Sequence, residues 1–161
     1  MRPLALALAL ALAPLAGLGC AHAGGFTGAD RDAIVALLAA QQSSWNRGDL
    51  EGFLRGYERS QDLLFTSGGE VRRGYAATRA QYQARYLGMA GATGTPDRSK
   101  MGQLAFTVRD VRGLGRDGAI VLGEWRLTGT PEAGEGVFSL AFFRTRAGWR
   151  IVHDHTSLAT P

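Results

Sequence analysis

The end of the chain holds the densest group of side chains that could do chemistry. Residues 153–157 read His-Asp-His-Thr-Ser and so offer imidazoles, a carboxyl and hydroxyls in one run. A carboxyl on the wall of a pocket can accept a proton or anchor a polar ligand, and paired histidines can share a metal ion. What the run does depends on which of these side chains face a cavity.

Strand periodicity decides which of these groups can act together. Apolar residues alternate at the start of residues 148–157, which predicts a final strand paired as a hairpin with the strand before it. If residues 147–148 form a two-residue loop, Asp154 lies among the small residues Ala141 and Ser139. Small neighbours leave room beside a carboxyl, so we expect the Asp154 face to line a pocket.

The two histidines of the run project from the opposite face of the same strand, because side chains alternate along a strand. The same register sets His153 opposite Phe142 and His155 opposite Leu140, among bulky apolar residues. A metal site needs further ligands, and nothing in the spacing of the sequence nominates them. A histidine packed under the first helix, with its ring nitrogens hydrogen-bonded, is the commoner arrangement. We therefore expect no metal and no other cofactor.

Asp154 also has a purely structural interpretation, in which it pairs with an arginine such as Arg126. Arg126 shares a strand face with Glu124, so both side chains could point inward or both could face solvent. We expect five aromatic residues to surround one cavity, although most aromatic residues at such spacing are simply part of the core. They are Trp45, Tyr57, Tyr82, Tyr86 and Trp125. The candidate site has Asp154 as the acid or base, and its other candidate pocket residues are Tyr57, Tyr82, Arg126, Ser139, His153 and His155.

Residues 1–23 have the features of a secretory signal peptide. A basic start is followed by a Leu/Ala run and by a small-x-small cleavage site that ends at Ala23. The run is shorter than the ~20 residues needed to span a bilayer. We expect residues 24–161 to form one periplasmic or secreted domain. The alternative is a lipoprotein box ending at Cys20, which would tether the protein to a membrane through a lipid on that cysteine.

Composition argues against several other classes. The formal net charge of +4 is a mild excess, and the longest basic run is Arg72-Arg73. Basic and aromatic residues show no interleaving of an RNA-binding kind, so we do not expect nucleic acid as a partner. Cys20 is the only cysteine, so the chain cannot form an internal disulfide and must depend on a packed core.

Helical periodicity comes first along the chain and strand periodicity second. Thr27 and Asp30 give a helix-start signal, and Asp49 caps a second helix after Gly48. The predicted helices are residues 29–47, 50–57 and 75–87. The predicted strands are residues 63–66, 71–73, 104–111, 120–127, 137–146 and 148–157. Residues 88–100 are expected to form a mobile loop, as a lid or an edge, and the whole pattern predicts an α+β fold with an antiparallel meander.

Together these residues resemble the nuclear-transport-factor-2-like superfamily, in particular its SnoaL-like branch of small bacterial stand-alone domains. The matching segments are residues 45–49, 65–69 with Gly74, 123–128, 136–140 and 148–157. The last segment is also similar to the end of the association domain of calcium/calmodulin-dependent protein kinase. The resemblance implies a cystatin-like cone, in which a curved antiparallel sheet wraps around three helices and leaves a pocket at its open end. It also implies a homodimer that forms through the outer face of the sheet.

Two functions remain open, because members of this superfamily include isomerases, dehydratases, cyclases and domains that only bind ligands. The first is an exported domain that binds a small, partly apolar ligand or serves as a dimerisation module. The second is a cofactor-independent isomerase, dehydratase or cyclase, with Asp154 or a pocket histidine as general acid or base. Asp49 is better explained as a helix cap, and Ser139 lies in no nucleophile motif. No complete acid–base set is visible, which favours the binding function.

Overall fold

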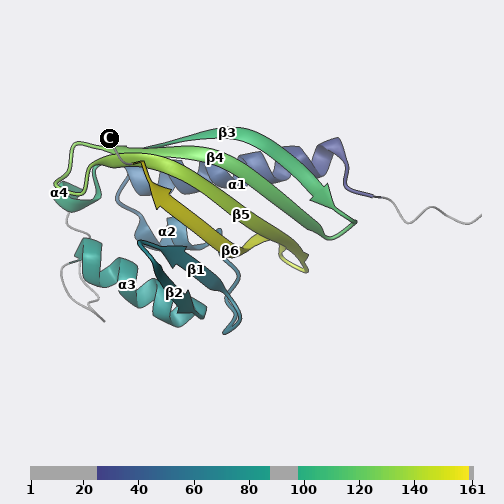
Figure 1. Cartoon of the computed structure of the whole chain (residues 1–161), viewed down its shortest axis with the longest axis horizontal. Coiled ribbons are helices and arrows are strands. Elements are labelled where there is room, and N and C mark those ends of the chain that lie inside the picture. Colours follow the sequence, from purple (N-terminus) through teal and green to yellow (C-terminus); the bar gives the residue numbers. More distant parts are fainter. Residues whose placement is uncertain (1–24, 88–97, 160–161) are drawn as a thin grey trace, which may run out of the picture.

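A computed structural model describes residues 25–87 and 98–159 of the chain (Figure 1). The helices are α1 (Gly28–Asn46), α2 (Leu50–Leu54), α3 (Tyr75–Leu87) and α4 (Arg98–Met101). The strands are β1 (Leu64–Ser67), β2 (Glu70–Arg73), β3 (Gln103–Leu114), β4 (Gly118–Thr128), β5 (Gly134–Thr145) and β6 (Gly148–Leu158). The expected signal peptide, Cys20 and residues 88–97 of the expected loop lie outside the described residues. The end of that expected loop forms the short helix α4.

The first two helices begin with the side-chain caps that the sequence predicts. Thr27 and Asp30 form a capping box at α1, in which Asp30 Oδ2 accepts from the Thr27 backbone N at 3.0 Å. Asp49 caps α2, where its Oδ1 accepts from the backbone N of Gly52 at 2.7 Å. None of the helices in the described part of the chain has the length and apolar character needed to cross a bilayer.

The strands form one curved sheet in the order β2-β1-β6-β5-β4-β3 (Figure 1). All neighbours are antiparallel except β1 and β6, which run parallel. The long helix α1 packs against β3 and α2, and α3 lies beside the short β1–β2 hairpin (Figure 1). The predicted α+β cone, with a curved sheet around N-terminal helices, is confirmed.

The predicted register of the last hairpin is wrong, for two reasons. The first is that the loop consists of Arg146 and Ala147 and not of residues 147–148. Gly148 already belongs to β6, where it pairs with Thr145, and its φ of +92° is one that glycine adopts readily. The second reason is a β-bulge at Val152, which has no partner on β5. The shifted loop moves the pairing by two residues and so leaves each side chain of β6 on the predicted face of the sheet. The one-residue bulge moves every residue after Val152 to the opposite face.

The bulge exchanges the surroundings of Asp154 and of the two histidines. Asp154 pairs with Leu140 and points to the buried, concave face of the sheet. His153 pairs with Ala141 and His155 with Ser139, on the convex face. His155 is exposed and His153 is half-buried, so neither is packed under the first helix.

Asp30 also joins the start of α1 to the β5–β6 hairpin. Its Oδ1 accepts from a guanidinium nitrogen of Arg144 and from Trp149 Nε1 at 3.4 Å, and the Arg144 guanidinium stacks 4.6 Å from the Trp149 ring centroid. Hydrogen bonds from the Thr27 backbone and hydroxyl, and then from Arg144, lower the pKa of Asp30 to about 2. The ionised carboxylate is therefore part of the native packing.

Candidate functional site

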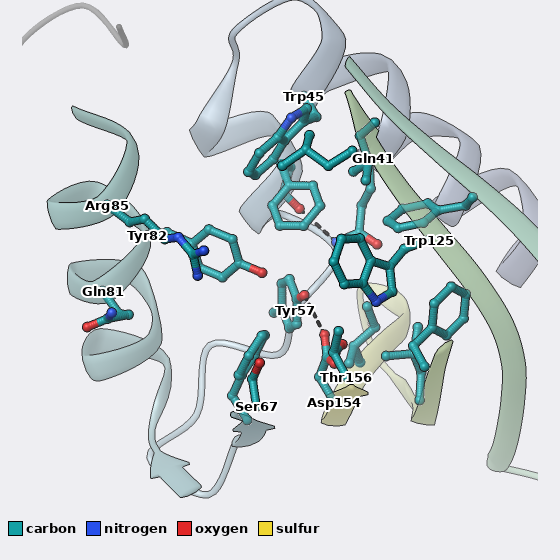
Figure 2. A pocket seen from close by; sticks show the side chains of 18 of the residues that line it. Gln41, Trp45, Tyr57, Ser67, Gln81, Tyr82, Arg85, Trp125, Asp154 and Thr156 are labelled. Atoms are coloured by element: carbon teal, nitrogen blue, oxygen red, sulfur yellow. Dashed lines mark hydrogen bonds between the residues drawn. The ribbon is translucent and has the colours of Figure 1, made fainter. Parts of the chain in front are cut away.

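A cavity of about 170 Å³ lies between α3, the β1–β2 hairpin, α1 and the concave face of the sheet (Figure 2). All six strands and the helices α1, α2 and α3 contribute side chains to its wall. The lining residues are Leu38, Gln41, Trp45, Phe53, Tyr57, Phe65, Ser67, Arg72, Gln81, Tyr82, Arg85, Tyr86, Leu104, Phe106, Trp125, Leu127, Glu132, Phe138, Leu140, Ile151, Asp154 and Thr156.

Aromatic rings make up much of this wall and brace one another. Trp45 contacts Tyr86 edge-on at 4.7 Å between ring centroids and Phe53 at 5.0 Å. Tyr82 lies 5.4 Å from Phe53 and 5.8 Å from Phe65. Such edge-to-face and tilted contacts fix ring orientation as well as burying area, so the cavity is bounded by a connected set of rings. The five aromatic residues singled out in the sequence all line it.

Asp154 is the buried carboxyl of the cavity and is only 4% exposed. Its Oδ2 accepts from the Tyr57 hydroxyl at 2.7 Å, and its Oδ1 accepts from Thr156 Oγ1 at 2.7 Å (Figure 2). Burial raises the pKa of Asp154, and the hydrogen bonds from Thr156 and Tyr57 oppose that rise. The group is thus an acid whose proton affinity is greater than that of an exposed aspartate.

Tyr57 reaches Asp154 because the chain just after α2 lies against β6. Residues 56–58 flank Ile151, where the Ile151 N donates to the Gly56 carbonyl and the Glu58 N donates to the Ile151 carbonyl, both at 2.9 Å. Beyond the bulge, β1 takes over as the neighbour of β6. Burial, and then the charge of Asp154, raises the pKa values of Tyr57 and Tyr82. Both phenols therefore keep their protons at physiological pH and can act as donors.

Gln41 is a polar residue of the cavity that the sequence did not reveal. It is 2% exposed, and its Nε2 donates to the carbonyl oxygen of Phe53 at 2.9 Å. Its Oε1 is buried and has no hydrogen-bond partner among the described residues. At the helical spacing of α1, a glutamine among apolar residues looks like any boundary position, so no sequence signal marked it.

Two arginines lie at the edge of the cavity. Arg85 Nε donates to Glu132 at 2.9 Å. Arg72 places its guanidinium 5.4 Å from the Phe65 ring centroid and meets Glu70 at 3.4 Å. The rim is therefore charged and ion-paired, whereas the interior is aromatic.

Four of the candidate pocket residues do not line the cavity. Arg126 is exposed and pairs with Glu135 at 2.9 Å, so it is neither a pocket residue nor the structural partner of Asp154. Ser139 lies on the convex face of β5, and the bulge in β6 places His153 and His155 on the same face. Only Tyr57, Tyr82 and Asp154 of the candidate set are brought together. Within residues 25–87 and 98–159, no three histidine, cysteine or acidic side chains gather as a metal would require.

The family model of the SnoaL-like domain matches residues 34–161, which is most of the chain. The chain belongs to the SnoaL-like family. This SnoaL-like domain is 34% identical to an NTF-2-like protein of unknown function from Shewanella oneidensis, with a TM-score of 0.70 and coverage of 79% of this chain and 98% of that one. The comparison with curated proteins gave no match.

Two more distant structures share the fold of this SnoaL-like domain. A domain of unknown function with a cystatin-like fold from Nostoc punctiforme is 23% identical, with a TM-score of 0.66 over 84% of this chain and 81% of that one. A ketosteroid isomerase-like protein from Erwinia carotovora atroseptica is 17% identical, with a TM-score of 0.59 over 84% of this chain and 100% of that one. At these identities the two likenesses show the shared fold.

Proposed function

We propose that this SnoaL-like domain binds a small, partly apolar molecule in the cavity between α3 and the sheet. The observation that carries the proposal is an aromatic cavity with the buried carboxyl of Asp154 in its wall. Ligand sites are typically apolar hollows with a few placed polar groups. A volume of about 170 Å³ is close to the ~150 Å³ of a cavity that holds benzene, so the ligand is of single-ring size.

Native mass spectrometry of the protein purified from its own host tests this proposal. We expect a retained compound of single-ring size. Ser67→Phe places a ring at a half-buried position that lines the cavity, and it should abolish retention. Val71→Phe adds the same ring to the same hairpin at a residue that is 68% exposed, and it should retain the ligand. A wild-type protein with an empty cavity, or equal retention by both variants, would contradict the proposal.

A second candidate function is proton transfer of the isomerase type, with Asp154 as general base and Tyr57 as its hydrogen-bonding neighbour. The raised pKa of Asp154 favours it, because a base works best when its pKa approaches the working pH. Exchange of the α-protons of a small cyclic ketone in D₂O, followed by NMR, measures this activity directly. Asp154→Asn should slow the exchange by about 10²–10⁴-fold. A folded Asp154→Asn variant with the wild-type rate would refute this candidate.

We also propose that the domain forms a homodimer through the convex face of the sheet. Leu122 on β4 is 46% exposed there, and Val137 and Phe143 on β5 are 56% and 52% exposed. Ion pairs such as Arg126 with Glu135 border this apolar area. Apolar centres with polar rims are typical of protein interfaces.

Export is the remaining part of the proposal. Removal of residues 1–23 would leave a periplasmic or secreted protein that begins at Gly24. Intact-mass measurement on the protein from each cell fraction distinguishes this form from one that begins at a lipidated Cys20. A full-length cytoplasmic form would contradict export.

A further inference from the structure

Gln41 lines the cavity, and its side-chain oxygen is a hydrogen-bond acceptor that no described residue satisfies. Its side chain extends from α1 toward Tyr57 and Trp125 (Figure 2). The donor bond from Nε2 to the Phe53 carbonyl fixes the orientation of the amide, because the opposite orientation would set two acceptors against each other. The amide oxygen is thus held on the side of the amide that faces away from the Phe53 carbonyl.

The position of Gln41 is confined by the backbone around it. Gly56 lies against the amide so closely that a Cβ there would stand 2.5 Å from Nε2. An acceptor left buried without a donor costs about 1–3 kcal/mol. Buried polar groups in native proteins nearly always have a partner in the protein, in an ordered water or in a bound molecule.

The other groups of the cavity define what that donor can be. Asp154 already accepts from Tyr57 and Thr156. Arg72 and Arg85 at the edge of the cavity already pair with Glu70 and Glu132, so these pairs add little net charge to the rim. An uncharged hydroxyl or N–H group on a single ring can donate a hydrogen bond to Gln41 Oε1 without burying a charge in the cavity.

We propose that Gln41 determines specificity by accepting a hydrogen bond from an uncharged hydroxyl or N–H donor on a single-ring ligand. This inference rests on the proposed binding function and adds the chemical class of the ligand. A ring of the same size that lacks the donor leaves the Gln41 oxygen unpaired and is rejected, as in other sites built to bond a ligand hydroxyl.

Phenol and toluene are matched probes, because they differ only in a hydroxyl in place of a methyl group. The quantity to measure is the ratio of the toluene Kd to the phenol Kd, by calorimetry or by ligand-observed NMR. We expect this ratio to fall about tenfold or more in Gln41→Met. Comparing ratios between proteins cancels the difference in hydration of the two probes. The Phe53 carbonyl keeps a second donor in Gly56 N at 3.3 Å, so the variant should fold.

Gln83→Met is the control, because Gln83 is a buried glutamine on α3 that does not line the cavity and meets Arg79 instead. Its ratio should equal that of the wild type. An unchanged ratio in Gln41→Met overturns the role of Gln41 and leaves ligand binding intact. If neither probe binds the wild type, both this inference and the proposed binding function fail.

A measurement on the wild type alone covers the case in which Gln41→Met does not fold. The side-chain carbonyl carbon of Gln41 should shift on titration with phenol and stay in place with toluene. Equal shifts with the two probes, or none with phenol, would overturn the inference.

Discussion

Replacing Tyr57 by phenylalanine removes one hydroxyl from the cavity and leaves Asp154 Oδ2 without its donor. The bond is 2.7 Å long, and both residues are almost fully buried, at 3% and 4% exposure. A hydrogen bond to a charged group contributes about 1.5–3 kcal/mol, and one between neutral groups about 0.5–1.5 kcal/mol. We therefore expect Tyr57→Phe to lower the free energy of unfolding by about 1.5–3 kcal/mol while Asp154 is ionised, and by about 0.5–1.5 kcal/mol once it is protonated.

Urea denaturation at a series of pH values from acidic to alkaline follows the change from one regime to the other. Because the folded pKa of Asp154 is raised, protonation of Asp154 stabilises the fold below its unfolded pKa, and this contribution is lost as pH rises through the folded value. The hydrogen bond from Tyr57 therefore contributes most to the free energy of unfolding at pH values above the folded pKa, where Asp154 is ionised. In an Asp154→Asn background the acceptor is neutral at every pH, so the effect of Tyr57→Phe should be small and constant. A loss that stays the same across the whole pH series in the wild-type background would refute this account of the pair.

Three further predictions concern other parts of the molecule. Asp30 has a lowered pKa, so its stabilisation is fully present above the ordinary aspartate pKa of 3.8 and is lost as pH falls through about 2; thermal melts should show a shallower acid limb for Asp30→Asn, and identical limbs would contradict the linkage. Gly123→Ala sets a Cβ 2.3 Å from the ring of Phe138 and should lower the free energy of unfolding by about 1–3 kcal/mol in urea titrations, whereas no loss would mean that the ring moves freely. Leu122→Asp should convert a dimer to monomers in sedimentation velocity, whereas Leu114→Asp, which changes a residue 60% exposed at the end of β3, should not; a dimer that survives Leu122→Asp would exclude this face.

Local signals in the sequence were sufficient for the starts of α1 and α2. The capping box of Thr27 and Asp30 and the cap at Asp49 depend on residues three apart, so their chemistry can be read without knowledge of the fold. The aromatic residues that line the cavity were also recognisable, because helical spacing placed Tyr82 and Tyr86 on one side of α3.

The site itself depended on features that have no local signal. The bulge at Val152 lies where β6 changes neighbours from residues 56–58 to β1, and strand alternation alone cannot foresee it. That single residue decides whether Asp154 or the histidines face the interior. The amide nitrogen of Gln41 donates to a carbonyl on another helix, and the amide oxygen is left unpaired. This arrangement can be recognised only when the fold is known.

The parallel pairing of β1 with β6 has a consequence for synthesis of the protein. The last strand to leave the ribosome lies inside the sheet, between one of the earliest strands and β5. The β1–β2 hairpin has no other strand to pair with in the sheet, so it must wait for the C-terminus before it can dock. Until then its edge is open to pairing with other chains. A nascent chain stopped before residue 148 would therefore lack both the middle of its sheet and the carboxyl of its cavity.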